Sequence, residues 1–210
     1  MISGIKEKLQ LLTPGHHGCF YYYDLQNAIE TTLVFLQIGL ERNERCIYLA
    51  SPEAIAKTKS LFKQTGFDLI KEAQKCRLAL FSDRDFLVNG RFEMDHMIKF
   101  IDQAIQEALR AGFTGLRGVG DVFWEMGPDQ DMIKLTNYEK KLDEVLSKQK
   151  ATILCQYDLK AIRPKYVRDS LFSHNAVIEP DHVCVDNHFH NSLYDFPRSS
   201  FDLMCKSLRQ

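Results

Sequence analysis

The sequence predicts an α/β domain in which helices flank a largely parallel central sheet. Short runs of β-branched and aromatic residues alternate with amphipathic helical patterns along almost the whole chain. This alternation is typical of layered α/β folds. The 210 residues are 45% hydrophobic and 26% charged, which suits one globular domain that needs no disulfide or metal to hold it together.

The first half of the chain is punctuated by clear helix boundaries. Ser51 is placed to cap a helix, Pro52 takes its first position, and Gly66 follows its end. Asp24 is expected to cap the preceding helix in the same way. The pattern predicts strands at 18–24, 45–51 and 77–83, helices at 25–42 and 52–66, and a short N-terminal helix containing Ile5, Leu9 and Leu12.

The second half continues the alternation. Apolar residues recur at helical spacing between Met94 and Leu109, and Gly112 stops that helix. We further expect strands at 114–121, 151–158, 176–179 and 182–186, and helices at 129–147, 164–172 and 198–210. No linker or repeat interrupts the chain, so we expect a single domain over 1–210, with a core at about 15–194, residues 1–14 as an N-terminal helix and 198–210 as a C-terminal helix.

Charge and cysteine content exclude several classes of protein. A net charge of −1 offers no basic surface for nucleic acid, and no apolar stretch is long enough for a membrane span. The six cysteines never form a C-x-x-C pair, which speaks against zinc ribbons and disulfide frameworks. We expect buried free thiols and a cytoplasmic protein.

The segment "GLRGVGDVFWEMG", residues 115–127, contains closely spaced glycines but matches no phosphate-binding motif. Lysine and hydroxyl residues are missing after Gly120, where a Walker A loop requires them. Phe123 occupies the position of the third glycine in the dinucleotide fingerprint. We therefore expect no nucleotide cofactor.

Arg117 and Asp121 share one face of this predicted strand, because side chains alternate along a strand. A buried guanidinium must be paired, so Arg117 either bridges to an acid such as Asp121 or holds a polar group of a ligand. Trp124, just past the strand, is either core or the wall of a pocket. Gln156 and Tyr157 end the strand at 151–158 and either orient a ligand or satisfy the strand terminus.

The histidines give only a weak metal signal. His182, His188 and His190 could supply imidazole ligands, but i and i+2 positions on a strand face opposite sides and no closed ligand set is visible. His16 and His17 precede the first strand, and solvent is the default expectation for both, although one of them could overhang the edge of a pocket. Glu139 lies among lysines and acids that form i,i+4 pairs, so a solvated helix face is the simpler expectation for it. No catalytic nucleophile or acid–base pair stands out, and we expect no catalysis.

Taken in order, these segments resemble the MEDS family, the methanogen/methylotroph sensory domain that also occurs in a dichloromethane-responsive regulator. The resemblance runs from about Gly15 to Tyr194 and rests on "CFYYYD", "FLQIGLERNERCIYLAS", "GRFEMDHMI", "GLRGVGDVFWEMG", "NYEKKLDEVL" and "ILCQYDLKAI". It departs from the family at Asp121, where Glu is more common.

The resemblance implies a RecA/KaiC-like fold without the Walker A loop and a non-catalytic role in prokaryotic signal transduction. It implies a small-molecule ligand of the kind of a simple hydrocarbon derivative, and a kinase or transcription regulator as partner, with a homodimer also open. The ligand-binding residues that it implies are His17, Arg117, Asp121, Trp124, Glu139, Gln156, Tyr157 and His174. Two alternatives stay open: an interaction module with a vestigial pocket, and a metal- or nucleotide-dependent enzyme.

Overall fold

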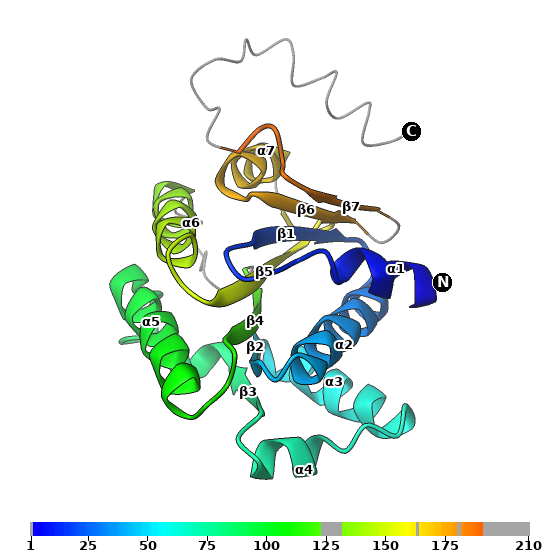
Figure 1. Ribbon diagram of the computed structural model, residues 1–210. Coiled ribbons are helices and arrows are strands. Elements are labelled where there is room, and N and C mark those ends of the chain that lie inside the picture. Colours follow the sequence, from blue (N-terminus) through cyan, green and yellow to red (C-terminus); the bar gives the residue numbers. More distant parts are fainter. Residues whose placement is uncertain (1, 123–131, 163, 180–181, 191–210) are drawn as a thin grey trace.

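The computed structural model describes residues 2–122, 132–162, 164–179 and 182–190. These residues form one seven-stranded sheet with helices on both faces (Figure 1). The strand order is β3-β2-β4-β5-β1-β6-β7. All neighbours are parallel except β6 and β7, which form an antiparallel pair at one edge. The predicted fold class and the closing strand pair are therefore confirmed.

The strands agree closely with the sequence-based expectation. Each predicted run of β-branched and aromatic residues forms a strand, and the ends shift by only a few residues. The strands are β1 (His17–Tyr22), β2 (Arg45–Ala50), β3 (Leu78–Ser82), β4 (Leu116–Asp121), β5 (Ala151–Asp158), β6 (Ala176–Glu179) and β7 (His182–Val185).

Within the described residues the helices also follow the predicted order, with two additions, and the N-terminal helix ends at Leu9, short of the expected residue 14. The expected helix at 198–210 lies outside the described residues. The described helices are α1 (Ile2–Leu9), α2 (Leu25–Glu41), α3 (Pro52–Gln64), α4 (Leu69–Gln74), the 3-10 helix η1 (Asp83–Phe86), α5 (Met94–Arg110), α6 (Met132–Leu146) and α7 (Pro164–Ser173). We did not predict α4 or η1. Helix α4 buries none of its residues, so it carries no hydrophobic periodicity that a sequence pattern could reveal. No helix in the described part of the chain is long and apolar enough to cross a bilayer.

Both predicted helix caps are present. The Asp24 carboxylate accepts a hydrogen bond from the backbone N–H of Gln26 at the start of α2. The Ser51 hydroxyl accepts one from Ala54 at the start of α3. A cap of this kind satisfies a backbone donor that the helix itself cannot pair, so the connections that follow β1 and β2 are fixed locally.

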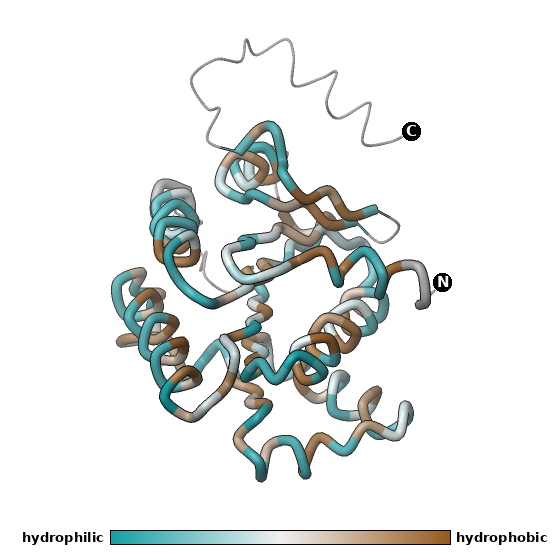
Figure 2. The backbone as a smooth tube through the Cα atoms, viewed as in Figure 1, coloured by the Kyte–Doolittle hydropathy of each residue, from teal (hydrophilic) through white to brown (hydrophobic). Residues whose placement is uncertain are grey.

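The sheet separates two hydrophobic layers. Helices α2 and α3 pack on one face, and α5 and α6 pack on the other (Figure 1). We call these the α2 face and the α6 face. Helix α7 contributes Tyr166 and Leu171 to the layer on the α6 face. Hydrophobic residues run along α2, β6 and β7 (Figure 2). Because strand residues alternate between the faces, each strand delivers side chains to both layers.

Candidate functional site

The residues predicted to share one pocket lie on two faces of the sheet. His17, Glu139, Tyr157 and His174 contact one another on the α6 face. Arg117 and Gln156 reach toward α2 on the opposite face. Trp124 lies outside the described residues. The candidates within the described residues therefore do not surround a single space, and the roles of all eight in ligand binding stay predictions.

Arg117 is fully buried against α2. Its Nε donates to the Glu44 carboxylate, and its guanidinium lies 4.5 Å from the centre of the Phe35 ring. Its Nη2 donates to the Leu12 carbonyl at 3.3 Å. The sequence left open whether Arg117 pairs with an acid of the protein or holds a ligand. This geometry favours the pair within the protein. The partner is Glu44, whereas we had expected an acid such as Asp121.

Asp121 and Gln156 occupy the carboxyl end of the sheet on the α2 face. They are register partners on β4 and β5. The Gln156 amide donates to the Thr32 hydroxyl at 2.6 Å, as a satisfied strand terminus would. Burial, and then the negative charge of Asp121, raise the pKa of Tyr22 and Tyr48, so Asp121 lies near these two hydroxyls.

A buried group of titratable side chains lies on the α6 face. We call His17, Glu139, Cys155 and His174 the buried quartet. They come from β1, α6, β5 and the connection between α7 and β6, and one potential ligand atom of each lies within 4.8 Å of the others. The Tyr157 hydroxyl donates to Glu139 Oε1 at 2.7 Å. The sheet thus gathers distant parts of the chain into one polar site inside an apolar layer.

Two of our sequence-based expectations for this site were wrong. Glu139 is 1% exposed and His17 is fully buried, although we had expected both in solvent. The charged residues of α6 predict a solvent-exposed helix face, and this pattern does not show that the Glu139 carboxylate faces inward. Cys155 and Asp143 were missed altogether, because their partners are far away in the sequence.

The quartet has a defined charge pattern. Burial alone lowers the pKa of His17, but hydrogen bonds with the carboxylates of Asp143 and Glu139 outweigh burial and raise it. Burial raises the pKa of Glu139, but attraction to His174 and His17 lowers it overall. For His174, burial and then repulsion by His17 lower the pKa to about 3. Glu139 is therefore a carboxylate and His174 a neutral imidazole near pH 7.

An outer set of groups orients the two imidazoles. His17 Nδ1 lies 3.6 Å from an oxygen of Asp143, whose other oxygen is 2.9 Å from His190 Nε2. His174 Nδ1 lies 2.7 Å from the Ser170 carbonyl oxygen. A carbonyl only accepts hydrogen bonds, so His174 Nδ1 carries the proton and its Nε2 lone pair faces the quartet.

The histidines that we considered for a metal site have other surroundings. His182 and His188 are exposed, and His190 pairs with Asp143. Among the described residues, none of these three belongs to a group of three or more metal-ligand side chains.

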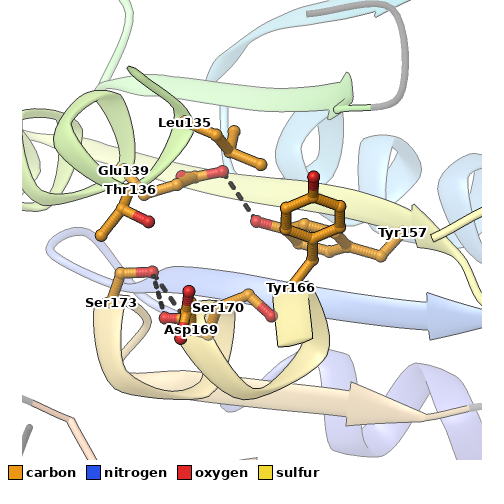
Figure 3. A pocket seen from close by; sticks show the side chains of 8 residues that line it. All are labelled: Leu135, Thr136, Glu139, Tyr157, Tyr166, Asp169, Ser170 and Ser173. Atoms are coloured by element: carbon orange, nitrogen blue, oxygen red, sulfur yellow. Dashed lines mark hydrogen bonds between the residues drawn. The ribbon is translucent and has the colours of Figure 1, made fainter. Parts of the chain in front are cut away.

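Two cavities border the α6 face. One of about 10 Å³ is lined by Glu139, Tyr157 and Ser170, among others, and Figure 3 shows the Glu139 carboxylate pointing toward the Tyr157 hydroxyl beside it. The other, of about 30 Å³, lies between β4, β5 and helices α5 and α6, and Cys155 is part of its wall. We call it the apolar cavity. Its lining is Ile47, Leu49, Met97, Phe100, Ile101, Gly118, Val119, Gly120, Val122, Tyr138, Ile153 and Cys155.

Comparisons with known proteins agree with this architecture. The sequence model of the methanogen/methylotroph, DcmR sensory domain (MEDS) matches residues 16–175. The transcriptional repressor DcmR of Methylorubrum extorquens is 25% identical over 162 residues, which cover 75% of this chain and 57% of the repressor. A KaiC-like protein from Pyrococcus horikoshii has a similar structure, with a TM-score of 0.59 at 17% identity over 79% of this chain and 72% of its own. That likeness shows the fold, and the chain spans little more than half the length of the repressor.

Proposed function

Because the chain belongs to the MEDS family of sensory domains, we propose that it binds a small, weakly polar molecule and passes the signal to a partner protein. Its relative from Methylorubrum extorquens is a transcriptional repressor, which supports a regulator as that partner. The ligand class that we propose is a simple hydrocarbon derivative such as a halomethane. No step of catalysis is part of this proposal.

The apolar cavity is the observation that carries the proposal. Met97, Phe100, Ile101 and Ile153 surround it with carbon, so it favours a ligand without charge. Since a cavity of about 10–15 Å³ holds one water molecule, its volume of about 30 Å³ suits a molecule of a few non-hydrogen atoms. This size and polarity exclude nucleotides and most metabolites.

Glycine at position 120 of β4 keeps this space open. A Cβ atom built on Gly120 would meet no other heavy atom within 4 Å. At Gly118, two residues earlier, it would lie 3.3 Å from Ile47 and 3.4 Å from Ile153. The wall of the apolar cavity therefore has little room for a side chain at Gly118 but has room for one at Gly120. A side chain added at Gly120 would occupy the space that we propose for the ligand.

The position of the cavity supports a role in signalling. A ligand can signal only if it binds two conformations of the domain unequally. In the apolar cavity it would contact the sheet together with α5 and α6, so it would stabilise one packing of these helices against β4 and β5. A partner that recognises either helix would sense that difference.

The test is a thermal-shift series on the full chain with dichloromethane, methanol, methylamine and acetate. We expect the halomethane to raise the midpoint of unfolding with increasing concentration, as a ligand of the native state must, and the two ions to have no effect. Gly120→Val should abolish the shift without lowering the midpoint of the unliganded protein. A wild-type protein that responds to none of the four, or a valine variant that keeps the shift, would contradict the proposal.

A further inference from the structure

We propose that the buried quartet of His17, Glu139, Cys155 and His174 is a binding site for one divalent transition-metal ion of the zinc class. This site is separate from the proposed function, because it would bind its ion whether or not the apolar cavity takes a ligand. Three observations support the inference: the chemistry of the donor atoms, the distances between them, and the groups that contact the two histidines from outside the quartet.

Four of the six distances between the donor atoms are close to those of a tetrahedral complex, and all four atoms lie within 4.8 Å of one another. With metal–nitrogen and metal–oxygen bonds of about 2.0–2.1 Å and a metal–sulfur bond of about 2.3 Å, tetrahedral donors lie roughly 3.3–3.7 Å apart. Glu139 Oε2 lies 3.2 Å from His17 Nε2, 3.5 Å from His174 Nε2 and 3.7 Å from Cys155 Sγ. Cys155 Sγ and His17 Nε2 are 3.4 Å apart.

The two nitrogen–oxygen distances are long for the direct hydrogen bonds of a carboxylate, which are about 2.7–2.9 Å when a nitrogen cation donates, whereas the Cys155 thiol donates a hydrogen bond to Glu139 Oε2 at 3.7 Å. The same carboxylate shows what a direct bond looks like here, because its Oε1 accepts from the Tyr157 hydroxyl at 2.7 Å. One oxygen of Glu139 is thus closely hydrogen-bonded, and the other is shared among three more distant donor atoms.

His174 has an unsatisfied buried atom that faces the quartet. Its Nδ1 donates to the Ser170 carbonyl, and its Nε2 lies 3.5 Å from a carboxylate oxygen of Glu139. No hydrogen bond satisfies this buried Nε2 within the described part of the chain. A buried polar atom without a partner is unfavourable, and a bound cation would give it one.

The donor set selects the kind of ion. Two imidazoles, a carboxylate and a thiolate suit zinc and its first-row neighbours, whereas a thiolate is a poor ligand for magnesium or calcium. With the Cys155 proton released to solvent, two neutral imidazoles and two anionic ligands balance the charge of a divalent ion. The complex is then neutral, which suits a fully buried position.

The surroundings of the quartet resemble those of known metal sites. Histidine ligands usually donate their second ring N–H to a carboxylate or a backbone carbonyl. The Ser170 carbonyl accepts from His174 in this way, and an oxygen of Asp143 lies 3.6 Å from His17 Nδ1, just beyond hydrogen-bond distance. The cavity of about 10 Å³ next to Glu139 is bordered by the partly exposed Thr136 and Asp169 (Figure 3).

Cobalt(II) is the probe, added to metal-stripped full-length chain that carries no affinity tag. We expect one equivalent to bind and to give the visible absorption of tetrahedral cobalt together with a near-ultraviolet thiolate-to-cobalt band. Zinc should displace cobalt, because it binds such ligands more tightly. A folded wild-type chain that takes up no stoichiometric cobalt would overturn the proposal.

Two cysteine variants form a matched pair. Cys19 and Cys155 are register partners on β1 and β5 and belong to the same hydrophobic layer, but Cys19 is not part of the quartet. Cys155→Ser should lose the charge-transfer band, and Cys19→Ser should keep it. Retention of the band in Cys155→Ser would overturn the assignment.

Asp143→Asn is a second variant that tests the proposal if Cys155→Ser does not fold. Replacing an outer partner of a ligating histidine typically weakens metal affinity about 10- to 100-fold, and we expect a loss of this size for cobalt. An unchanged affinity would count against the role of His17. No small organic ligand is added in these measurements. A negative cobalt result would therefore leave the proposed function intact, and a negative thermal-shift result would leave the metal site intact.

Discussion

Gly39 of α2 lies directly against the side chain of Arg117 in β4. A Cβ atom built on Gly39 would come within 2.7 Å of both Arg117 Cδ and Cys46 Sγ. The absence of a side chain at this helical position is what lets the guanidinium pass beneath α2 to reach Glu44. The close approach links the packing of α2 to the buried ion pair.

Gly39→Ala should therefore destabilise the protein even though alanine favours helices. The helix gains about 1 kcal/mol from the substitution, but overpacking of a filled core costs about 1–3 kcal/mol. We expect a lower free energy of unfolding in urea denaturation. Gly120→Ala is the control, because its new methyl group meets no atom within 4 Å and should leave stability unchanged or slightly higher. Equal effects of the two substitutions would contradict this view of α2.

A double-mutant cycle tests the structural role of Arg117. Removing one partner of a buried ion pair strands the other charge and costs about 3–5 kcal/mol, whereas replacing both by apolar residues is often neutral. Arg117→Met and Glu44→Met should each be strongly destabilising, and the double variant should be more stable than either. The chemical-denaturation midpoints of the four proteins provide the measurement. If the two losses simply add, Glu44 is not the partner that matters.

The same variants separate structure from ligand binding. We expect the Arg117→Met/Glu44→Met protein to keep the wild-type thermal shift with dichloromethane, because neither residue lines the apolar cavity. A folded double variant that no longer responds to the halomethane would return Arg117 to the list of ligand-binding residues.

The sequence identified the buried arginine but not its partner. A guanidinium on an interior strand must be neutralised, and this requirement left two interpretations open, a bridge to an acid of the protein or a contact with a ligand; the pair with Glu44 fits the first. The partner Glu44 lies just before β2, between two elements whose relative position depends on the whole sheet. Local spacing carries no information on such a contact, so the nearer Asp121 seemed the natural choice.

The composition of the site shows a second limit of sequence reasoning. Gln156 and Tyr157 are adjacent on β5, so alternation alone sends their side chains to opposite faces. That signal was present in the sequence and would have divided the predicted pocket. The buried quartet, in contrast, draws its residues from three separate elements and one connection, and no motif spacing could have assembled it.

The cysteines differ sharply in predicted reactivity. Burial raises the pKa of Cys19 and Cys46 to about 12, so almost none of either thiol is the reactive thiolate at about pH 8. Cys76 is exposed, which corrects our expectation that the thiols are generally buried. Iodoacetamide treatment of the native protein followed by peptide mass spectrometry should modify Cys76 rapidly and leave Cys19 and Cys46 intact until urea unfolds the chain. Modification of either buried thiol at the rate of Cys76 would show that the sheet opens readily.

The most direct test of the sensory account is a crystal structure of the full chain with dibromomethane, using the anomalous signal of bromine to locate the ligand. The account predicts a bromine peak in the apolar cavity, between Gly120 of β4 and Met97 of α5, and its loss in crystals of Gly120→Val. A bromine peak only elsewhere, or none at a concentration that shifts the midpoint of unfolding, would contradict the account.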